Sequence, residues 1–437
     1  MARSWMKLVL PLLCTAVAAA PAPTAAAPEF VVDDITNSYV AQQLPGFGQL
    51  PGLGQLPGLG GLAGAGQLPG GAAAGGVPAA SSSCTATTHA EVAKVLASCK
   101  DAVIDGVKFP PSPGKTALDL KLANGHSVTF KGHIVFQAVP ASGRSAGGKW
   151  LLIQATGTNV KILGAPGNII DGQGQEYWDG QGGNGGSKKP KFFGATLHGS
   201  LVQGLNIKNS PVHTFSISGC TDTTFDKITI DNSAGDKEKA GAKYGHNTDA
   251  FDVGLSKGVT ISNAHVRNQD DCLAVNSGTN IKFLNGTCIG GHGLSIGSVG
   301  GRSGDGGNIV KNVKIADSKI IDSENGVRIK TNAGTTGEVS DITYTNIELR
   351  GITKRGVVMQ QDYKNGGPTK TPTGGVPIKR ITLNRVTGTV KGSGQNVYVM
   401  CAACSDWTWT GVSITGGGKK EPCKGAPSAA SKFCSSA

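Results

Sequence analysis

The stretch that decides the fold reads GHNTDAFDV at residues 245–253, NQDDCLAVNSG at 268–278, GGHGLSIGSVGGR at 290–302 and NGVRIKTN at 325–332. The interval from Asp249 to Asp271 is 22 residues, and the interval from Asp270 to His292 is also 22. Internal repeats of this length are typical of solenoids. If each interval is one turn of a repeating backbone, the three carboxylates and the imidazole stack at one edge of it.

Short runs with alternating apolar and polar residues recur around these blocks. Counted between first residues, the steps are 31, 22, 32, 29 and 39. Asn, Asp or Gly follows nearly every run and supplies a turn, and long patterns of period 3.6 are missing. We therefore expect an all-β fold, a right-handed parallel β-helix (a solenoid). The runs are 228–230, 259–261, 281–283, 313–315, 342–344 and 381–383.

The β-helix geometry restricts which polar side chains can meet. Side chains alternate faces along a strand, so Asn247 and Asp249 share a face, as do Arg328 and Lys330. We expect these outward faces to line one groove. Adjacent aspartates at 270–271 point in opposite directions on a straight strand, so both reach a substrate only if the chain bends there.

Composition divides the chain into three parts. Residues 1–20 carry two cations before an apolar run and small residues at the end, which indicates a secretory signal peptide. Residues 21–83 repeat a Gln-Leu-Pro-Gly unit among Ala and Gly, which predicts a disordered extension. We expect residues 84–437 to form the β-helix catalytic domain, with a short helix at 88–97 capping its N-terminal end. No stretch is long and apolar enough for a membrane anchor.

Ten cysteines and a signal peptide imply an oxidising destination, so we expect a secreted, extracellular protein. Cys14 leaves with the signal peptide, so nine cysteines remain; four local pairs then leave Cys220 as the odd one, and we expect a buried free thiol there. The sequon at Asn285 is a candidate glycosylation site. Connectivity is not fixed by sequence, but proximity favours the pairs Cys84 with Cys99, Cys272 with Cys288, Cys401 with Cys404, and Cys423 with Cys434.

The charge balance favours an anionic partner. The formal net charge is +12, and it becomes +13 for residues 84–437 once the signal's two cations and the extension's three acids are removed. A secreted basic domain attracts polyanions. Few aromatic residues and no nucleic-acid motif are present, so we expect no nucleic acid as partner. An acidic polysaccharide fits the secreted context better.

The four blocks together resemble the signature of the polygalacturonases of glycoside hydrolase family 28. The similarity runs from about Cys84 to Cys434 and is carried by NTD at 247–249, DD at 270–271, GHG at 291–293 and RIK at 328–330. Further stretches, such as QQDY at 360–363 and DWTW at 406–409, resemble the fungal endo-acting members. One block alone is weak evidence for the family, but all four blocks in this order are highly specific for it.

The resemblance implies a role for each polar residue of the blocks. Hydrolysis of a glycosidic bond with inversion needs an acid for the leaving oxygen and a base that directs water. By resemblance, Asp270 is the general acid, and Asp249 and Asp271 hold and activate the water. Crowding of three carboxylates should raise one pKa and keep the acid protonated. His292 lies one coil on, where it can share a proton with the acid.

Recognition of galacturonate requires cations. Arg328 and Lys330 suit the sugar carboxylate, because Arg binds it bidentately and Lys acts as a point charge. By resemblance, Tyr363 contacts the sugar and Asn247 lies near the cleavage site. We expect Asp252 to be structural.

Two histidines and one basic run lie near the blocks and need not belong to the catalytic site. His246 and His265 are expected to be surface or turn residues. The basic run at 188–191 is either a solvated surface or part of the substrate rim.

The resemblance thus predicts a secreted endo-polygalacturonase that hydrolyses α-1,4 bonds in de-esterified pectin (polygalacturonate), with no metal and no other cofactor. We expect a monomer without membrane contact, and a plant polygalacturonase-inhibiting protein is a further possible partner. Exo-action or a rhamnogalacturonan substrate within the same family, a pectate lyase, and an inactive pectin-binding paralogue stay open as alternatives.

Overall fold

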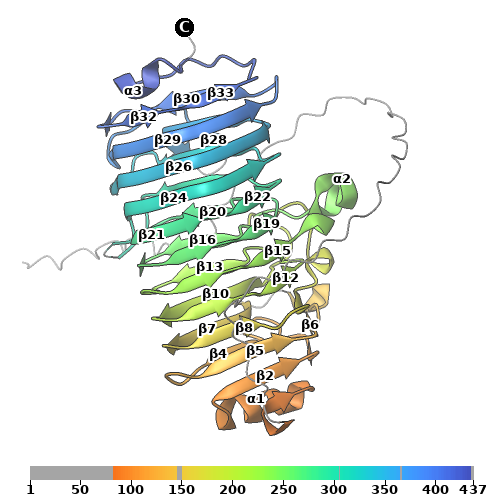
Figure 1. The fold of residues 1–437 in the computed structure, drawn as a ribbon. Helices are drawn as coiled ribbons and strands as arrows, with labels where there is room; N and C mark the ends of the chain where they lie inside the picture. The colour runs from red at the N-terminus through yellow and green to blue at the C-terminus, as the bar shows by residue number, and fades with distance from the viewer. Residues whose placement is uncertain (1–81, 145–149, 305, 365–366, 435–437) are drawn as a thin grey trace, which may run out of the picture. The chain divides into compact units, whose positions relative to one another are not determined.

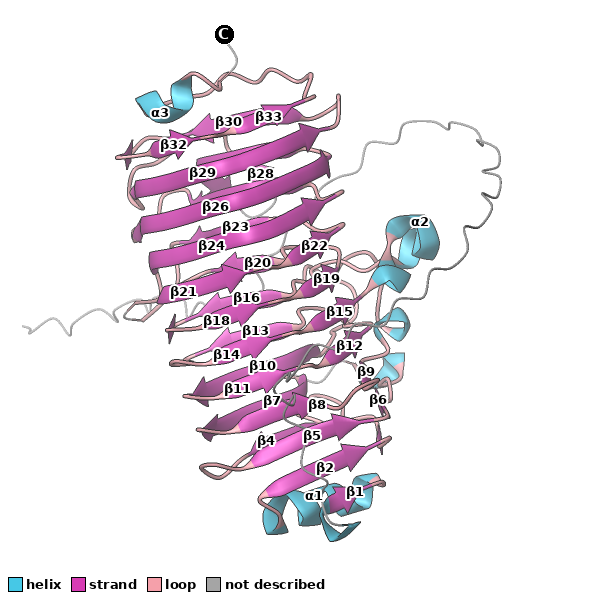
Figure 2. Ribbon diagram, viewed as in Figure 1, coloured by secondary structure: helices cyan, strands magenta, loops and turns pink. Residues whose placement is uncertain are grey.

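A computed structural model describes residues 82–144, 150–304, 306–364 and 367–434. Within this part the chain forms a stack of β-coils with few helices (Figures 1 and 2). The expected signal peptide and the extension up to residue 81 lie outside the described residues. The solenoid architecture predicted from the sequence repeat is confirmed.

One sheet runs along the stack and is built from one strand of each coil. Its strands are parallel, except that β28 (Gly367–Pro368) pairs antiparallel with β27. The parallel strands are β4 (Leu118–Lys121), β7 (Leu151–Thr158), β10 (Lys191–His198), β13 (Phe215–Ser218), β16 (Phe251–Gly254), β20 (Leu273–Val275), β23 (Leu294–Val299), β25 (Asn325–Asn332), β27 (Arg355–Lys364) and β30 (Gln395–Met400).

The remaining strands form the other sides of the coils, and their pairings are parallel as well. They are β1 (Thr85–Ala86), β2 (Asp101–Asp105), β3 (Lys108–Phe109), β5 (Ser127–Lys131), β6 (His133–Phe136), β8 (Lys161–Gly164), β9 (Ile169–Asp171), β11 (Leu201–Gln203), β12 (Asn206–Lys208), β14 (Thr224–Asp226), β15 (Thr229–Asp231), β17 (Ser256–Lys257), β18 (Thr260–Ser262), β19 (His265–Arg267), β21 (Gly278–Leu284), β22 (Thr287–Ile289), β24 (Ile309–Ile321), β26 (Glu338–Ile352), β29 (Ile378–Val390), β31 (Cys404–Ser405), β32 (Thr408–Thr410) and β33 (Ser413–Thr415).

The core is a ladder of apolar side chains, one from each coil. Phe193, Phe215, Phe251, Leu273 and Leu294 follow one another in register, and all are fully buried. The ring centroids of Phe215 and Phe251 are 5.3 Å apart and stacked. Because each ring packs on the coil above and the coil below, the register of one coil fixes the register of the next.

Asparagines in the left-handed region make the corners of the coils. Asn263 and Asn285 have φ of 55° and 53°, a conformation that Asn tolerates better than most residues. The side-chain amide of Asn285 donates to Oδ1 of Asn263 at 2.7 Å. Corner residues of successive coils therefore hydrogen-bond to each other.

The observed register confirms four of the five predicted steps. Ile281, Val313, Ile342 and Ile381 are paired in one column, which gives the steps 32, 29 and 39. The step of 22 also holds, because Ile261 pairs with Phe283.

The first predicted step, from Ile228 to Val259, is wrong. Phe225 pairs with Ile261, so the coil that precedes Ile261 is longer than the predicted step. Ile228 belongs to a different side of the coil, because its carbonyl accepts from the amide of His265. Several sides carry similar short strands, so the sequence pattern alone assigned the run to the wrong column.

Both ends of the stack are closed by small elements. Helix α1 (His89–Ser98) begins with a capping box between Thr88 and Glu91 and buries Val92 and Val95 against the first coils. Helix α3 (Ser428–Ser431) lies at the other end, and α2 (Lys237–Ala240) lies on a side loop (Figure 1). In the described ranges, none of the helices has the length and apolarity needed to cross a bilayer.

Four disulfides join the cysteine pairs favoured by proximity: Cys84–Cys99, Cys272–Cys288, Cys401–Cys404 and Cys423–Cys434. Cys220, alone among the cysteines that the structure describes, is a buried free thiol. Burial raises its pKa to about 11, although the amide of Leu197 partly offsets this. The thiol is therefore protonated and unreactive at neutral pH.

Truncation of the aromatic ladder tests the packing. Phe215→Ala removes a ring that touches Phe193, Phe225 and Phe251, so we expect a loss of about 3–5 kcal/mol in the free energy of unfolding. Denaturant unfolding followed by intrinsic fluorescence measures it. Leu255→Ala at an exposed apolar position should change stability by less than about 0.5 kcal/mol. Equal losses in the two variants would contradict the ladder.

Candidate active site

Four polar side chains occupy the same place in four successive coils. His213, Asp249, Asp271 and His292 each lie two residues before the first residue of their strand, β13, β16, β20 and β23. The first residues of these strands are aligned in register. The backbone therefore stacks these four positions at one edge of the sheet.

The 22-residue interval predicted that Asp270 and His292 occupy the same position in successive coils. The structure corrects this prediction. Leu273 of β20 pairs with Leu294 of β23, and this step is shorter by one position than the interval from Asp270 to His292. His292 consequently follows Asp271 in the column, and Asp270 is offset by one residue. Asn247 has φ of 51° and precedes the strand, so the prediction that it shares a strand face with Asp249 is wrong.

Asp270 and His292 form a buried pair. Nδ1 of His292 is 2.9 Å from Oδ1 of Asp270, and the amide of Asp271 donates to the same oxygen at 2.8 Å. The side-chain amide of Asn247 donates to Oδ2 of Asp270 at 3.2 Å. Nε2 of His292 lies 3.4 Å from Glu324, so its ring is held between two carboxylates.

The charges of this pair fix where the proton resides. Burial alone would raise the pKa of Asp270, but the adjacent imidazolium of His292 overcomes burial and lowers it. Burial would lower the pKa of His292, but Asp270 and Glu324 raise it. In the free protein the pair therefore holds one proton, and that proton lies on the imidazole side.

The carboxylate whose pKa is raised by crowding is Asp249 rather than Asp270. Burial, followed by repulsion from Asp270, Asp252 and Asp271, raises the pKa of Asp249 well above its ordinary value. The sequence predicted that one carboxylate would be raised and that it would be the acid. The first part agrees with the structure, whereas the structure raises a different residue.

Both carboxylate oxygens of Asp271 have partners. Nζ of Lys330 donates to its Oδ2 at 2.8 Å, and the hydroxyl of Ser295 donates to its Oδ1 at 2.7 Å. Arg328 lies 3.9 Å from Oδ1. Arg328 and Lys330 share the outward face of β25, as predicted from strand alternation.

Tyr363 lies beside these two cations. The Arg328 guanidinium and the Lys330 ammonium are 5.6 Å and 5.3 Å from its ring centroid, within cation–π range. All eight residues of the expected catalytic and substrate-binding set are buried, and His292 is the most exposed at 8%. The structure thus brings together all the residues that the four sequence blocks singled out.

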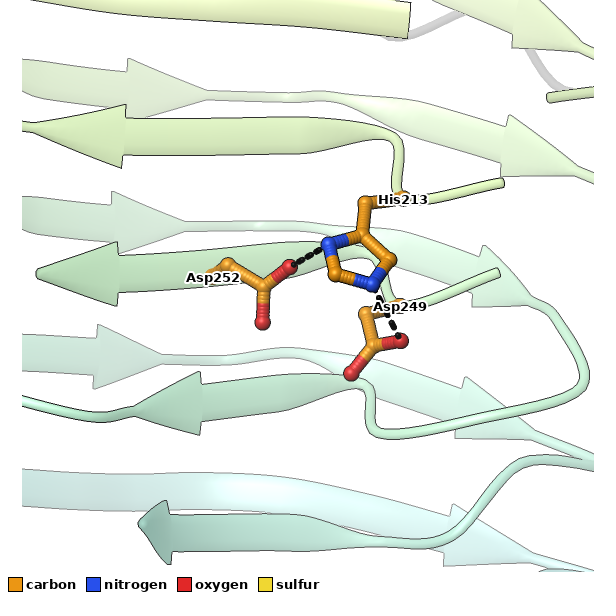
Figure 3. A group of neighbouring side chains, drawn as sticks. All are labelled: His213, Asp249 and Asp252. Atoms are coloured by element: carbon orange, nitrogen blue, oxygen red, sulfur yellow. Dashed lines mark ion pairs between the residues drawn. The ribbon is translucent and has the colours of Figure 1, made fainter. Parts of the chain in front are cut away.

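Sequence reasoning missed two members of the cluster. His213 contacts Asp252 and Asp249 (Figure 3), and Glu324 contacts His292. Asp252, expected to be structural, raises the pKa of Asp249 by repulsion. His246, expected at the surface or in a turn, lies half-buried in a loop and acts electrostatically on Asp270, whose pKa it helps to lower. One sequence signal could have revealed His213. The number of residues from His213 to Asp249 equals the number from the first residue of β13 to the first residue of β16, which are paired.

Asn285 lies away from this cluster, at an exposed corner. Its side-chain nitrogen donates to Asn263, and a glycan at this atom would replace one donor of the corner ladder. Glycosylation at Asn285 stays a prediction.

Two groups of side chains have the composition of a metal site. One contains His213, Asp249 and Asp252, and the other contains Asp270, Asp271 and His292. In the second group Lys330 already occupies an oxygen of Asp271, so a cation there would compete with an ammonium group.

The chain is similar to known proteins over most of its length. The family model described as "Glycosyl hydrolases family 28" matches residues 99–434. A polygalacturonase of Cochliobolus carbonum is 53% identical over 356 residues, covering 80% of this chain and 93% of the relative. Endopolygalacturonase 1 of Colletotrichum lindemuthianum is 52% identical and covers 81% and 93%.

Solved structures share the fold. Endopolygalacturonase I from Stereum purpureum, complexed with two galacturonate, matches with a TM-score of 0.64 and 34% identity, covering 76% of this chain and 95% of that chain. Endo-xylogalacturonan hydrolase from Aspergillus tubingensis has a TM-score of 0.66 at 24% identity, covering 81% and 99%, which supports the fold alone. The chain, with its coils, its stacked carboxylates and its family match over residues 99–434, belongs to glycosyl hydrolases family 28.

Proposed function

We propose that this protein is an endo-polygalacturonase that hydrolyses α-1,4-galacturonosyl bonds in de-esterified pectin with inversion. The observation that carries the proposal is the buried Asp270–His292 pair, which stores one proton beside the Asp271–Lys330 pair. A proton donor, a water-binding carboxylate and two cations within one cluster are what hydrolysis of an acidic glycan requires. The names of the fungal relatives support the same activity.

In this mechanism Asp270 is the general acid. The proton that the pair stores on His292 passes to Asp270 when negative charge develops on the leaving oxygen. Asn247 holds Oδ2 of Asp270 at 3.2 Å and thereby fixes the orientation of the carboxyl. His292 acts as a positioning residue and proton store.

Asp249 and Asp271 bind the attacking water. Lys330 and Ser295 donate to the oxygens of Asp271 and fix the orientation of its carboxylate. Asp249 accepts the proton of the water, and its raised pKa makes it a stronger base once it is ionised. The two carboxylates lie in adjacent coils, so the water is held by both.

Arg328, Lys330 and Tyr363 recognise the substrate. A galacturonate carboxylate next to the scissile bond pairs with the guanidinium and the ammonium, and the sugar ring rests on the phenol ring. The net charge of +12 attracts the polyanion from a distance. The protein works as an extracellular monomer without a metal or other cofactor, and a plant polygalacturonase-inhibiting protein is a possible partner.

Product analysis tests the reaction class. With polygalacturonate and a chelator present, we expect oligomers of mixed length, measured as reducing ends and by anion-exchange chromatography. Endo-cleavage leaves both fragments long at early times. Monomer alone would assign an exo-acting hydrolase, an unsaturated product absorbing in the ultraviolet would assign a lyase, and binding without cleavage would assign an inactive pectin-binding protein.

Leaving-group dependence tests the acid assignment. Asp270→Asn should lose a factor of about 10²–10⁴ in kcat on polygalacturonate, because the leaving oxygen is no longer protonated. A galacturonosyl fluoride, whose leaving group needs no proton, should be hydrolysed by this variant with a much smaller loss. Asp249→Asn should lose activity on both substrates, and Asp341→Asn on the outer face should resemble the wild type. Retained fluoride hydrolysis in Asp249→Asn alone would reverse the two roles.

The pH profile of kcat/KM tests the proton store. His292 loses its proton only as the pH rises through its raised pKa, so we expect an alkaline limb above the ordinary histidine value of about 6.5. Asp249 must be ionised, so the acid limb lies above about pH 4. His292→Gln should move the alkaline limb to lower pH by about one unit or more, and the exposed His265→Gln should move neither limb. An unchanged alkaline limb in His292→Gln would rule out the store.

A further inference from the structure

His213 lies between two carboxylates and is not used by the hydrolytic mechanism. Its Nδ1 is 2.8 Å from Oδ2 of Asp252, and its Nε2 is 3.7 Å from Oδ1 of Asp249 (Figure 3). The short contact places Nδ1 against the Asp252 carboxylate. Nε2, on the other side of the ring, faces Asp249.

The two distances differ in kind. At 2.8 Å the Asp252 contact has the length of a charge-assisted hydrogen bond, whereas 3.7 Å is too long for one. Zinc binds histidine nitrogen and carboxylate oxygen at about 2.0–2.2 Å, so two ligands of a tetrahedral ion are about 3.4 Å apart. The gap between Nε2 and Oδ1 of Asp249 therefore has nearly the width that a metal ion spans.

The oxygen that faces the gap has an unused hydrogen-bonding capacity. Asp249 is 7% exposed, and its buried Oδ1 has no hydrogen-bond partner in the part of the chain that the structure describes. Asp252 behind the ring supplies the second carboxylate of a carboxylate–histidine–metal arrangement, which orients the ring and strengthens it as a ligand. The side chain of His213 is 22% exposed, so its ring borders solvent.

We propose that His213 and Asp249 bind a divalent transition-metal ion such as Zn²⁺, and that the bound ion blocks hydrolysis by occupying the water-activating carboxylate. One imidazole and few carboxylate oxygens do not suit Ca²⁺, which takes six to eight oxygens. Waters complete the coordination. Lys191 and Arg302 act electrostatically on Asp252, so we expect micromolar affinity, weaker than that of a structural zinc site.

Titration of the full chain with ZnCl₂ in a calorimeter tests binding without reference to activity. We expect one ion per chain, and X-ray absorption at the zinc edge should show a single histidine among nitrogen and oxygen ligands. His213→Gln should weaken binding at least tenfold. Asp252→Asn keeps both ligands but removes the orienting carboxylate, so it should weaken binding by about 10–100-fold.

Two histidine variants serve as controls. His133→Gln removes an exposed histidine 3.9 Å from Asp171, and His292→Gln removes the imidazole of the other metal-like group; both should bind zinc like the wild type. No binding by the wild type, or equal binding by His213→Gln, would overturn the proposal, as would loss of binding in His292→Gln alone. Unfolding midpoints exclude misfolding as the cause.

The inhibitory part rests on the proposed hydrolase function and is measured separately. Zinc should slow release of reducing ends by the wild type at least tenfold, and EDTA should restore the rate. Any residual activity of His213→Gln should be insensitive to zinc. Failure of the metal-free protein to hydrolyse polygalacturonate would refute the hydrolase function, whereas the calorimetric results would still decide the zinc site.

Discussion

The stacking of one coil on the next is the constraint on which the rest of the structure depends. Phe215 packs on Phe251 in register, and each outward position inherits its place from that ladder. A residue two places before its strand therefore meets the equivalent residues of the adjacent coils. The active-site cluster is therefore built on one column of aligned positions, and four successive coils each contribute a polar side chain to it.

The same stacking concentrates charge, and the cluster is stable only because each ionised group has a counter-charge. Asp271 is paired with Lys330, and Asp270 is paired with His292. Asp249 has no cation at hydrogen-bonding distance among the described residues, and burial followed by repulsion from the neighbouring aspartates raises its pKa. Two aspartates of one cluster thus differ in protonation because of their neighbours, although their burial is similar.

The sequence predicted the fold and the membership of the cluster better than its internal arrangement. The four later steps of the repeat were readable because the same side of each coil carries similar short strands. The first step was wrong because other sides of the coil carry similar short strands too, and Ile228 lies on one of those sides. His213 and Glu324 were missed because their partners come from neighbouring coils, and coil length varies along the stack. Which carboxylate keeps a proton depends on distances of a few ångströms, and no sequence spacing specifies these.

The placement of the disulfides affects how the fold can come apart. Cys84–Cys99 lies in the first turn of the stack, and Cys401–Cys404 and Cys423–Cys434 lie in the last turns. In a one-dimensional array a coil at an end has one stabilising neighbour, whereas an inner coil has two, so unfolding is easiest at the ends. Disulfides at both ends stabilise the coils at which unfolding would otherwise begin. The catalytic coils lie between these ends, and the fourth disulfide, Cys272–Cys288, clips one of those coils as well.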